Sequence, residues 1–166
     1  EYENVVPGGY LPNSSDVYYY LARLRRKKDV KPPQFDVYGR FGTEFATGIR
    51  SRALKSLGSQ GSFRFEGGAK RIRYSRFMSE VSRSSVVVDL PGNGPFCFRL
   101  IDYFAVGSCV VAAKHGTILH VPLEDMMHLA YVKPDVSDLA PVCEGLLANL
   151  ELQRELVESS RDYFDR

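Results

Sequence analysis

The run Ser85-Val86-Val87-Val88-Asp89-Leu90 limits the fold more than any other feature of the sequence. It is almost continuously apolar, and β-branched residues dominate it. A strand with one face in water alternates apolar and polar residues, so this run predicts a strand that is buried on both faces. Such strands occur in parallel sheets whose two faces are covered by helices.

A helix and a second apolar strand follow this run. Residues 96–106 have helical spacing, and Gly107 stands at the position where glycine commonly ends a helix. Ser108-Cys109-Val110-Val111-Ala112 then predicts the next strand. A crossover helix between two strands places them parallel in one sheet.

The rest of the chain repeats this alternation. Other strands are predicted at 35–38, 62–68 and 128–132. Other helices are predicted from the capping residues at 13–16 to the basic run before Pro32, and at 47–57, 73–83, 137–149 and 151–165. The length of 166 residues and the 44% of hydrophobic residues fit one domain with a real core. We therefore expect residues 1–166 to form a single Rossmann-like α/β domain, a three-layer sandwich with a mainly parallel sheet.

Membrane and secreted proteins are disfavoured by the sequence. No apolar run approaches the about 20 residues that cross a bilayer, and the charged N-terminal third does not resemble a signal peptide. The three cysteines, Cys97, Cys109 and Cys143, are odd in number, which favours reduced thiols. We expect no membrane span and a cytoplasmic location, or the Golgi lumen if the parent protein is eukaryotic.

A metal site is not expected either. No pair of cysteines has metal-ligand spacing, and the histidines do not form a compact motif with nearby carboxylates. The residues considered were His115, His120, His128, Glu124 and Asp125.

Charge is distributed unevenly along the chain. Residues 1–85 hold 16 Lys and Arg against 8 Asp and Glu, whereas residues 86–166 hold 6 against 12. The basic half suggests an anionic partner such as a phosphate. The alternative is a basic helix face in water, which is the simpler interpretation of the cluster Arg23, Arg25, Arg26, Lys27 and Lys28.

The loop after the strand 85–90 has the composition of an anion site. It is rich in Gly and Pro, which allow a ligand to approach the backbone, and it follows the carboxyl end of a strand. The helix after it points its free N–H groups and the positive end of its dipole toward the loop. We expect a phosphate group to be bound by Gly92, Asn93, Gly94, Pro95, Phe96 and Arg99.

Arg99 and Asp102 lie three residues apart, so they share one face of this helix. A cation in the first helical turn is disfavoured by the dipole unless an anion is bound, and the fork of Arg matches phosphate oxygens. Asp102 would then accept hydrogen bonds from ribose hydroxyls or hold Arg99 in place. The alternative is a simple ion pair at a helix start. The loop lacks both the third glycine of G-x-G-x-x-G and the Gly-Lys-Ser/Thr of a P-loop.

The chain resembles the C-terminal, donor-binding half of GT-B glycosyltransferases over residues 35–166, most closely over 85–112. The nearest groups are exostosin-like enzymes and the capsule-associated, protein O-glucosyltransferase-like enzymes. Those families share a strand, a G-x-G loop, an Arg-Leu-x-Glu/Asp-x-x-Ala-x-Gly helix and a strand ending in Val-Val. The matching residues are Gly92, Gly94, Arg99, Leu100, Asp102, Ala105, Gly107, Val110 and Val111.

The resemblance implies transfer of a hexose from a nucleoside diphosphate sugar, UDP-sugar or GDP-sugar, to a hydroxyl of a glycan or protein acceptor. It implies that Arg99 is catalytic, because it would stabilise the leaving diphosphate, and that no metal or other cofactor is used. It also implies a partner domain, the N-terminal GT-B half of a longer enzyme. Two departures stand out: Asp102 replaces the commoner Glu, and Gly94 occupies the place of the first Glu of E-x7-E.

The same resemblance adds residues from two other strand ends. Arg40 follows the strand 35–38, where a basic residue often neutralises donor phosphate; the alternative is a plain surface turn. The loop after the strand 62–68 often contacts the base, which implicates Gly68 and Arg71, although solvated side chains are the simpler interpretation of Lys70, Arg71 and Arg73 taken singly.

Two other functions remain open at this point. The first is a non-catalytic nucleotide- or phosphate-binding α/β module. The second is an RNA-binding domain that uses the basic half, but RNA platforms interleave surface aromatics with Arg, and the aromatics here fall mainly on core positions. We therefore expect no nucleic-acid partner. The last helix, 151–165, either crosses to the N-terminal GT-B domain or docks on this one.

Overall fold

A computed structural model describes residues 15–94, 96–117, 119 and 121–166. Its centre is a five-stranded sheet in which every pair of neighbouring strands is parallel. The strands stand in the order β2-β1-β3-β4-β5. They are β1 (Phe35–Arg40), β2 (Phe65–Gly68), β3 (Ser84–Asp89), β4 (Cys109–Ala113) and β5 (Ala130–Val132).

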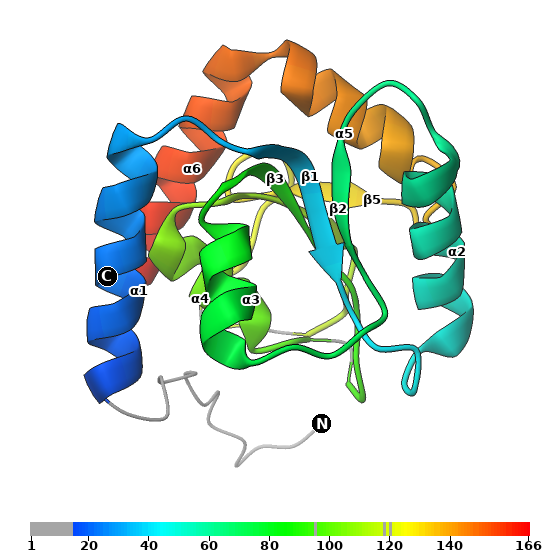
Figure 1. Ribbon diagram of the computed structural model, residues 1–166, viewed down its shortest axis with the longest axis horizontal. Helices are drawn as coiled ribbons and strands as arrows, with labels where there is room; N and C mark the ends of the chain where they lie inside the picture. The colour runs from blue at the N-terminus through cyan, green and yellow to red at the C-terminus, as the bar shows by residue number, and fades with distance from the viewer. Residues whose placement is uncertain (1–14, 95, 118, 120) are drawn as a thin grey trace.

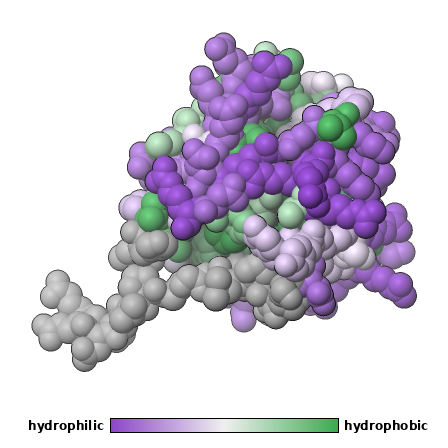
Figure 2. All heavy atoms as spheres, turned by 90° about the vertical axis from the view of Figure 1, so that its left-hand side faces the viewer, coloured by the Kyte–Doolittle hydropathy of each residue, from purple (hydrophilic) through white to green (hydrophobic). Residues whose placement is uncertain are grey.

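Helices cover both faces of this sheet, as Figure 1 shows. The helices are α1 (Ser15–Val30), α2 (Thr47–Ser59), α3 (Tyr74–Val81), α4 (Arg99–Val106), α5 (Leu139–Ala148) and α6 (Leu150–Asp165). The predicted fold class, a Rossmann-like α/β three-layer sandwich with a parallel sheet, is therefore confirmed. The side of the molecule where α1 and α6 lie is largely hydrophilic (Figure 2), because these helices keep one face in water.

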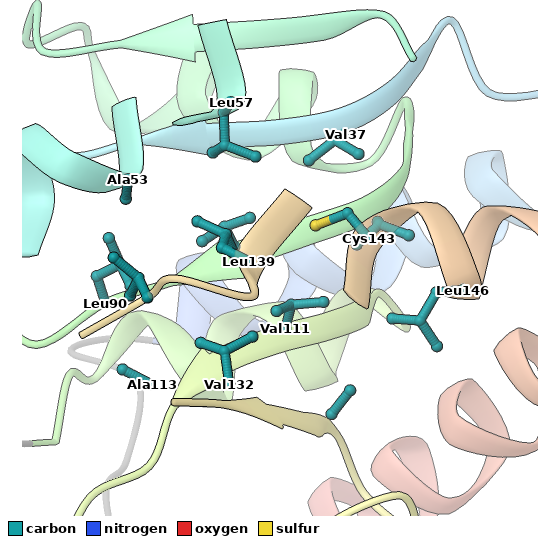
Figure 3. Close-up of a cluster of buried hydrophobic side chains, with 14 of the residues drawn as sticks. Val37, Ala53, Leu57, Leu90, Val111, Ala113, Val132, Leu139, Cys143 and Leu146 are labelled. Carbon is teal, nitrogen blue, oxygen red and sulfur yellow. The ribbon is translucent and has the colours of Figure 1, made fainter. Parts of the chain in front are cut away.

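The apolar run that predicted a doubly buried strand is β3. Val86 and Val88 belong to the core cluster under α2 and α5, which Figure 3 draws in close-up, whereas Val87 belongs to the cluster under α1, α3 and α4. All three valines are at most 1% exposed. The period of two along a strand sends alternate side chains to opposite faces, so one continuous apolar run serves two cores.

The C-terminal helix α6 packs on this same domain. It contacts α4, α5 and β4. Its Leu156 belongs to the core under α2 and α5, and Tyr163 and Phe164 pack against the other core. Of the two alternatives for this helix, the structure shows docking on its own domain.

The starts of α4 and β5 differ from the sequence prediction. The helix predicted at 96–106 begins at Arg99, because the carbonyl oxygens of Cys97 and Phe98 accept short-range bonds in a preceding turn. β5 begins two residues after His128, whose Nδ1 accepts a hydrogen bond from the Glu124 amide and closes a turn. Gly107 ends α4 in the left-handed conformation, with φ of 72°, as predicted.

None of the described helices is long and apolar enough to cross a membrane.

Candidate functional site

A pocket lies at the carboxyl edge of the sheet, where the order of the strands reverses. β1 has β2 on one side and β3 on the other, so the loops that follow β1 and β3 leave in opposite directions. The pocket has a volume of about 450 Å³ and is lined by residues from the loops after β1, β2 and β3. Ligands of open parallel sheets bind at such a reversal. We call this cavity the switch-point pocket.

Positive charge dominates the wall of the switch-point pocket. Five basic side chains line it, against one acidic side chain, Glu44. The basic residues are Arg40, Arg50, Lys70, Arg71 and Arg99. What each of them can offer to a ligand depends on how far its own charge is already paired within the protein.

Arg99 lies at the first residue of α4, beside the loop predicted to bind phosphate. Its Nη2 donates to the Leu90 carbonyl oxygen at 3.3 Å and lies 3.5 Å from Asp89 Oδ1. Its side chain is 18% exposed, and its buried Nε has no hydrogen-bond partner among the described residues. The guanidinium is thus fixed at the end of β3 with donor capacity left over.

Arg50 is the residue that the sequence analysis missed. It belongs to the first turn of α2 and is only 5% exposed. Its Nε donates to the Pro91 carbonyl oxygen at 2.8 Å, and its Nη1 donates to the Gly42 carbonyl oxygen. Arg50 therefore joins the loop after β1 to the loop after β3 through two neutral acceptors, and neither of them balances its charge.

A signal for Arg50 was present in the sequence. Arg50, Ala53 and Leu57 are the buried residues of α2, and their spacing of three and four residues defines one helix face. An arginine on the apolar stripe of a helix next to a strand end is unusual, because a buried charge needs partners. The stripe therefore predicts a buried guanidinium, although it does not show what the guanidinium contacts.

One carboxylate, that of Asp89, is influenced by both Arg50 and Arg99. Burial raises the pKa of Asp89 to about 6, while Arg99 and Arg50 act in the opposite direction. Burial lowers the pKa of Arg50, and the positive charge of Arg99 lowers it further. At neutral pH the group of three keeps a net positive charge in a place with little water, which is the electrostatic condition for binding an anion.

Arg40, the second predicted phosphate ligand, lines the pocket but is already neutralised. Its Nη2 lies 3.5 Å from Glu80 Oε2 and 3.6 Å from Glu66 Oε1. Its Nε donates to the Tyr38 hydroxyl at 3.2 Å, and its Nη1 donates to the Lys70 carbonyl oxygen at 3.1 Å. The structure thus places Arg40 at the site, with its charge directed to carboxylates of the protein.

Arg71 and Glu44 form an ion pair between the loop after β2 and the loop after β1. Their side chains are 73% and 61% exposed, so the pair is held in water and contributes little to stability. Glu44 is also the acidic side chain of the pocket wall. A ligand phosphate that takes the place of Glu44 on Arg71 would remove this negative charge from the pocket.

The glycine loop after β3 makes room for arginine. A Cβ on Gly92 would lie 3.2 Å from Arg50 Nη2, so the glycine permits the guanidinium to pack against the backbone. The Gly92 amide donates to the Gly94 carbonyl oxygen at 3.1 Å. Gly92 and Asn93 line the pocket. The Gly92 amide is therefore used within the loop, whereas guanidinium groups of the wall face the cavity.

Four of the residues predicted to bind the donor do not line the pocket. Gly68, Gly94, Phe96 and Asp102 are not among the described residues that line it. Gly68 ends β2, and its carbonyl oxygen accepts from the Phe41 amide at 3.1 Å. The ring of Phe96 packs edge to face on His115, with centroids 5.4 Å apart. Pro95, also predicted to bind the donor, and His120 lie outside the described residues.

Asp102 is buried on the core side of α4, where it is 1% exposed. Burial raises its pKa to about 6, although the Tyr74 hydroxyl and Arg99 favour the charged form. Its Oδ2 has no hydrogen-bond partner among the described residues. Asp102 therefore carries a cost at neutral pH that an unfolded chain would not carry.

Asp102→Asn is expected to make the chain more stable at pH 7 and less sensitive to pH. The side chain of an unfolded aspartate has a pKa of about 4, so the folded chain holds the Asp102 proton more tightly than the unfolded chain does. The stability that this group contributes to the parent chain is therefore fully present below about pH 4 and is lost as the pH rises to about 6. The shift corresponds to at most about 3 kcal/mol at pH 7. Urea unfolding from pH 4 to 8 measures this.

The control for Asp102→Asn is Asp162→Asn, at an exposed position of α6. Part of the loss of stability between pH 4 and 6 should persist in both variants, because burial raises the pKa of Asp89 as well. An Asp102→Asn variant as pH-sensitive as the parent would show that this carboxyl is not held protonated by burial.

No group of three or more His, Cys, Asp or Glu residues suited to a metal ion occurs in the described part of the chain. What the pocket offers instead is two guanidinium groups at the end of β3, those of Arg50 and Arg99, with further basic residues on its wall. Such an arrangement can hold a diphosphate, whose oxygens match the paired donors of arginine.

Comparison with solved structures finds a domain of similar fold. The chain is similar to the C-terminal domain of a glycosyl transferase group 1 family protein (LpcC) from Francisella tularensis, with a TM-score of 0.56 and 14% sequence identity. The match covers 92% of this chain and 92% of that chain. No protein-family model matches the sequence, and no curated protein matches it. The likeness shows the fold, that of a GT-B C-terminal domain.

Proposed function

We propose that this chain is the donor-binding half of a glycosyltransferase, in which the switch-point pocket binds a nucleoside diphosphate sugar. The reaction is the transfer of a hexose from that donor, a UDP-sugar or GDP-sugar, to a hydroxyl of a glycan or protein. The support from comparison is a fold shared with the C-terminal domain of a glycosyl transferase. The support from this chain is the chemistry of the pocket.

One observation carries the proposal: Arg50, which is buried, and Arg99, whose side chain is 18% exposed, both lie at the carboxyl end of β3, where the Asp89 carboxylate acts on both. Two cations that disfavour each other in a dry site are stabilised when an anion enters between them. A diphosphate supplies two phosphate groups and several oxygens, so it can accept from both guanidinium groups at once.

This charge arrangement suits the chemical step as well as binding. When the bond between the sugar and the diphosphate breaks, its electron pair goes to a phosphate oxygen, and negative charge develops on the leaving group. A fixed guanidinium stabilises that charge more than it stabilises the intact donor, and this difference lowers the barrier. Arg99 is placed for this role, because its guanidinium is anchored to the Leu90 carbonyl oxygen and keeps an unpartnered Nε among the described residues.

The rim of the pocket is apolar on one side. Phe45 and Phe98 line it and are 46% and 53% exposed. Aromatic faces at the mouth of a charged pocket suit the flat and weakly polar parts of a nucleotide sugar. We place the acceptor and its base in an N-terminal GT-B domain as the partner of this chain, and we retain the expectation that no metal takes part.

Arg99→Ala is expected to lower the affinity for UDP or GDP by about tenfold to a hundredfold, since a charge-assisted hydrogen bond to phosphate is lost. Arg99→Lys should recover part of it, because the charge stays and the fork does not. Calorimetric titration with UDP, GDP and their sugar derivatives measures these affinities.

Arg52→Ala is the matched control, because Arg52 is exposed on α2 and contacts the Asp135 carbonyl oxygen. Its affinities should equal those of the parent chain. A chain that binds UDP and GDP with no gain from the attached sugar would favour a non-catalytic phosphate-binding module. Equal diphosphate affinity in the Arg99→Ala and parent chains would remove Arg99 from the site.

A further inference from the structure

A second pocket lies at the amino edge of the sheet, opposite the switch-point pocket. Its volume is about 540 Å³, and its wall is formed by the end of α1, the start of β3, Gly107 and one face of α6. In Figure 1 the arrow of β1 points away from this edge, and the ion pair between Arg161 and Asp29 joins α6 to the end of α1 here. We call it the α1–α6 pocket.

The floor of the α1–α6 pocket carries the half-buried ammonium group of Lys28. Lys28 Nζ donates to the Ser84 carbonyl oxygen at 2.5 Å. An ammonium group has three donors, and this is the hydrogen bond that the described residues show for it. Ser84 is fully buried and Ser82 is 8% exposed, so the base of the cavity is protein and not open water.

Arg161 closes the same floor from α6. Its Nη2 is paired with Asp29, which neutralises that charge. A Cβ on Gly107 would lie 2.1 Å from Arg161 Nε, so the guanidinium lies directly over the glycine that ends α4. Gly107 leaves room for the Arg161 side chain and Asp29 forms an ion pair with it, so Arg161 is held in place as part of the wall. On this floor, Lys28 is then the cation that faces the cavity.

The rim adds further positive charge. Lys31 and Arg154 line the pocket on opposite sides, and Glu158 is the acidic residue of the wall that is not engaged by Arg161 in the described ion pairs. When the paired Arg161 and Asp29 are not counted, three cations line the pocket with one carboxylate, that of Glu158. The cations are Lys28, Lys31 and Arg154. Val157 and Leu150 give the cavity an apolar side as well.

We propose that the α1–α6 pocket binds a small organic anion, with a phosphate or carboxylate group against Lys28 and an apolar body against Val157 and Leu150. The volume lies in the range of small-molecule sites. The charge of the wall selects an anion, and the mixed lining selects one with a carbon skeleton. The site is at the other edge of the sheet from the switch-point pocket, so its ligand is separate from the proposed donor.

Burial lowers the pKa of Lys28 to about 8, and Arg161 lowers it while Asp29 and Cys109 raise it. Burial raises the pKa of the Cys109 thiol to about 12, so that group stays neutral over the working range. Lys31, Arg154 and Glu158 face the same cavity. An anion favours the charged ammonium, so affinity should fall as pH rises through about 8, and binding at that pH should take up a proton.

The test is a titration of the whole chain with phenyl phosphate, benzoate and inorganic phosphate, each at constant ionic strength, followed by amide chemical shifts. We expect saturable shifts at Ser84, Ser85, Gly107 and Gln153. Phenyl phosphate and benzoate separate the phosphate and carboxylate sources. Shifts at Gly42 and Gly92 report the switch-point pocket independently.

Lys28→Met should weaken this binding by about tenfold or more, because a charge-assisted contact is lost. Lys27→Met is the matched control, an exposed neighbour on α1 that does not line the pocket. If Lys28→Met fails to fold, Arg154→Gln on the exposed rim should still weaken binding severalfold. Equal binding in Lys28→Met and Lys27→Met, equal binding in Arg154→Gln and the parent chain, or no shift at the four amides with any probe, would overturn the proposal.

Discussion

Arg50→Met is expected to lower the affinity for UDP or GDP by about a hundredfold, the largest functional effect of any single replacement in this chain. Two causes combine. The replacement removes one of the two guanidinium groups at the end of β3, and it leaves the Pro91 and Gly42 carbonyl oxygens without their donor. Each carbonyl left without a donor costs about 1–3 kcal/mol where water cannot replace it. Calorimetric titration with UDP and GDP gives the affinity, and urea unfolding gives the stability.

Arg52→Met tests whether the effect belongs to Arg50. Both residues lie on α2, but Arg52 is exposed and donates to the Asp135 carbonyl oxygen, away from the pocket. Arg50→Lys should give an affinity for UDP and GDP between those of Arg50→Met and the parent chain. The lysine keeps the charge, but its single ammonium group cannot donate to both loops as the planar guanidinium does. If the Arg50→Met chain is folded and binds diphosphate like the parent chain, the paired-arginine site is wrong.

Gly67→Ala is expected to destabilise the chain by about 3 kcal/mol or more, the largest effect on stability. Gly67 has a φ of 144°, which a residue with a side chain rarely adopts. An added Cβ would lie 1.9 Å from the Gly39 carbonyl oxygen of the neighbouring strand. Neither atom can move without separating β1 from β2, because Gly39 and Gly67 are register partners.

Gly58→Ala is the control for this replacement and should have the opposite sign. Gly58 is near the end of α2, and an added Cβ there meets no atom within 4 Å. Alanine in a helix is favoured over glycine by about 0.5–1 kcal/mol, so this variant should be slightly more stable. Urea unfolding compares both with the parent chain. A Gly67→Ala chain of parental stability would mean that β2 does not run beside β1 as described.

The fold was predictable because its main signal is local. The alternation of apolar runs with helical spacing needs only a few residues at a time, and it gave the parallel sheet and the buried β3. The partition of β3 between two cores follows from the period of two, as Val86 and Val87 show. The start of α4 was not predictable to the residue, since residues 96–98 have helical spacing but make short-range turns.

The candidate site was predictable only in part, because its electrostatics are non-local. The loop after β3 and Arg99 share one stretch of sequence and lie together in the fold. Arg50 reaches the Pro91 carbonyl oxygen across 41 residues. Arg40 was expected to meet a phosphate, yet its charge is directed to Glu66 and Glu80, a pairing set by strand order and not by spacing.

Asp102 illustrates the same limit. Its spacing from Arg99 suggests an ion pair or a ligand to ribose, and spacing alone does not show which side of a short helix faces the core. The structure places the carboxyl at 1% exposure. The role predicted for Asp102 in donor binding stays a prediction. Its raised pKa is a property that can be measured.

The order of the strands also determines how the chain can associate with copies of itself. The valine-rich β3 and its apolar neighbour β4 are interior strands, while the edges are β2 and β5, with four and three residues. Short edges offer few unpaired backbone groups to another chain, so the folded protein is protected against edge-to-edge growth. The segment 84–90 becomes available for cross-β stacking only on unfolding, and fibril formation should therefore follow the unfolded population.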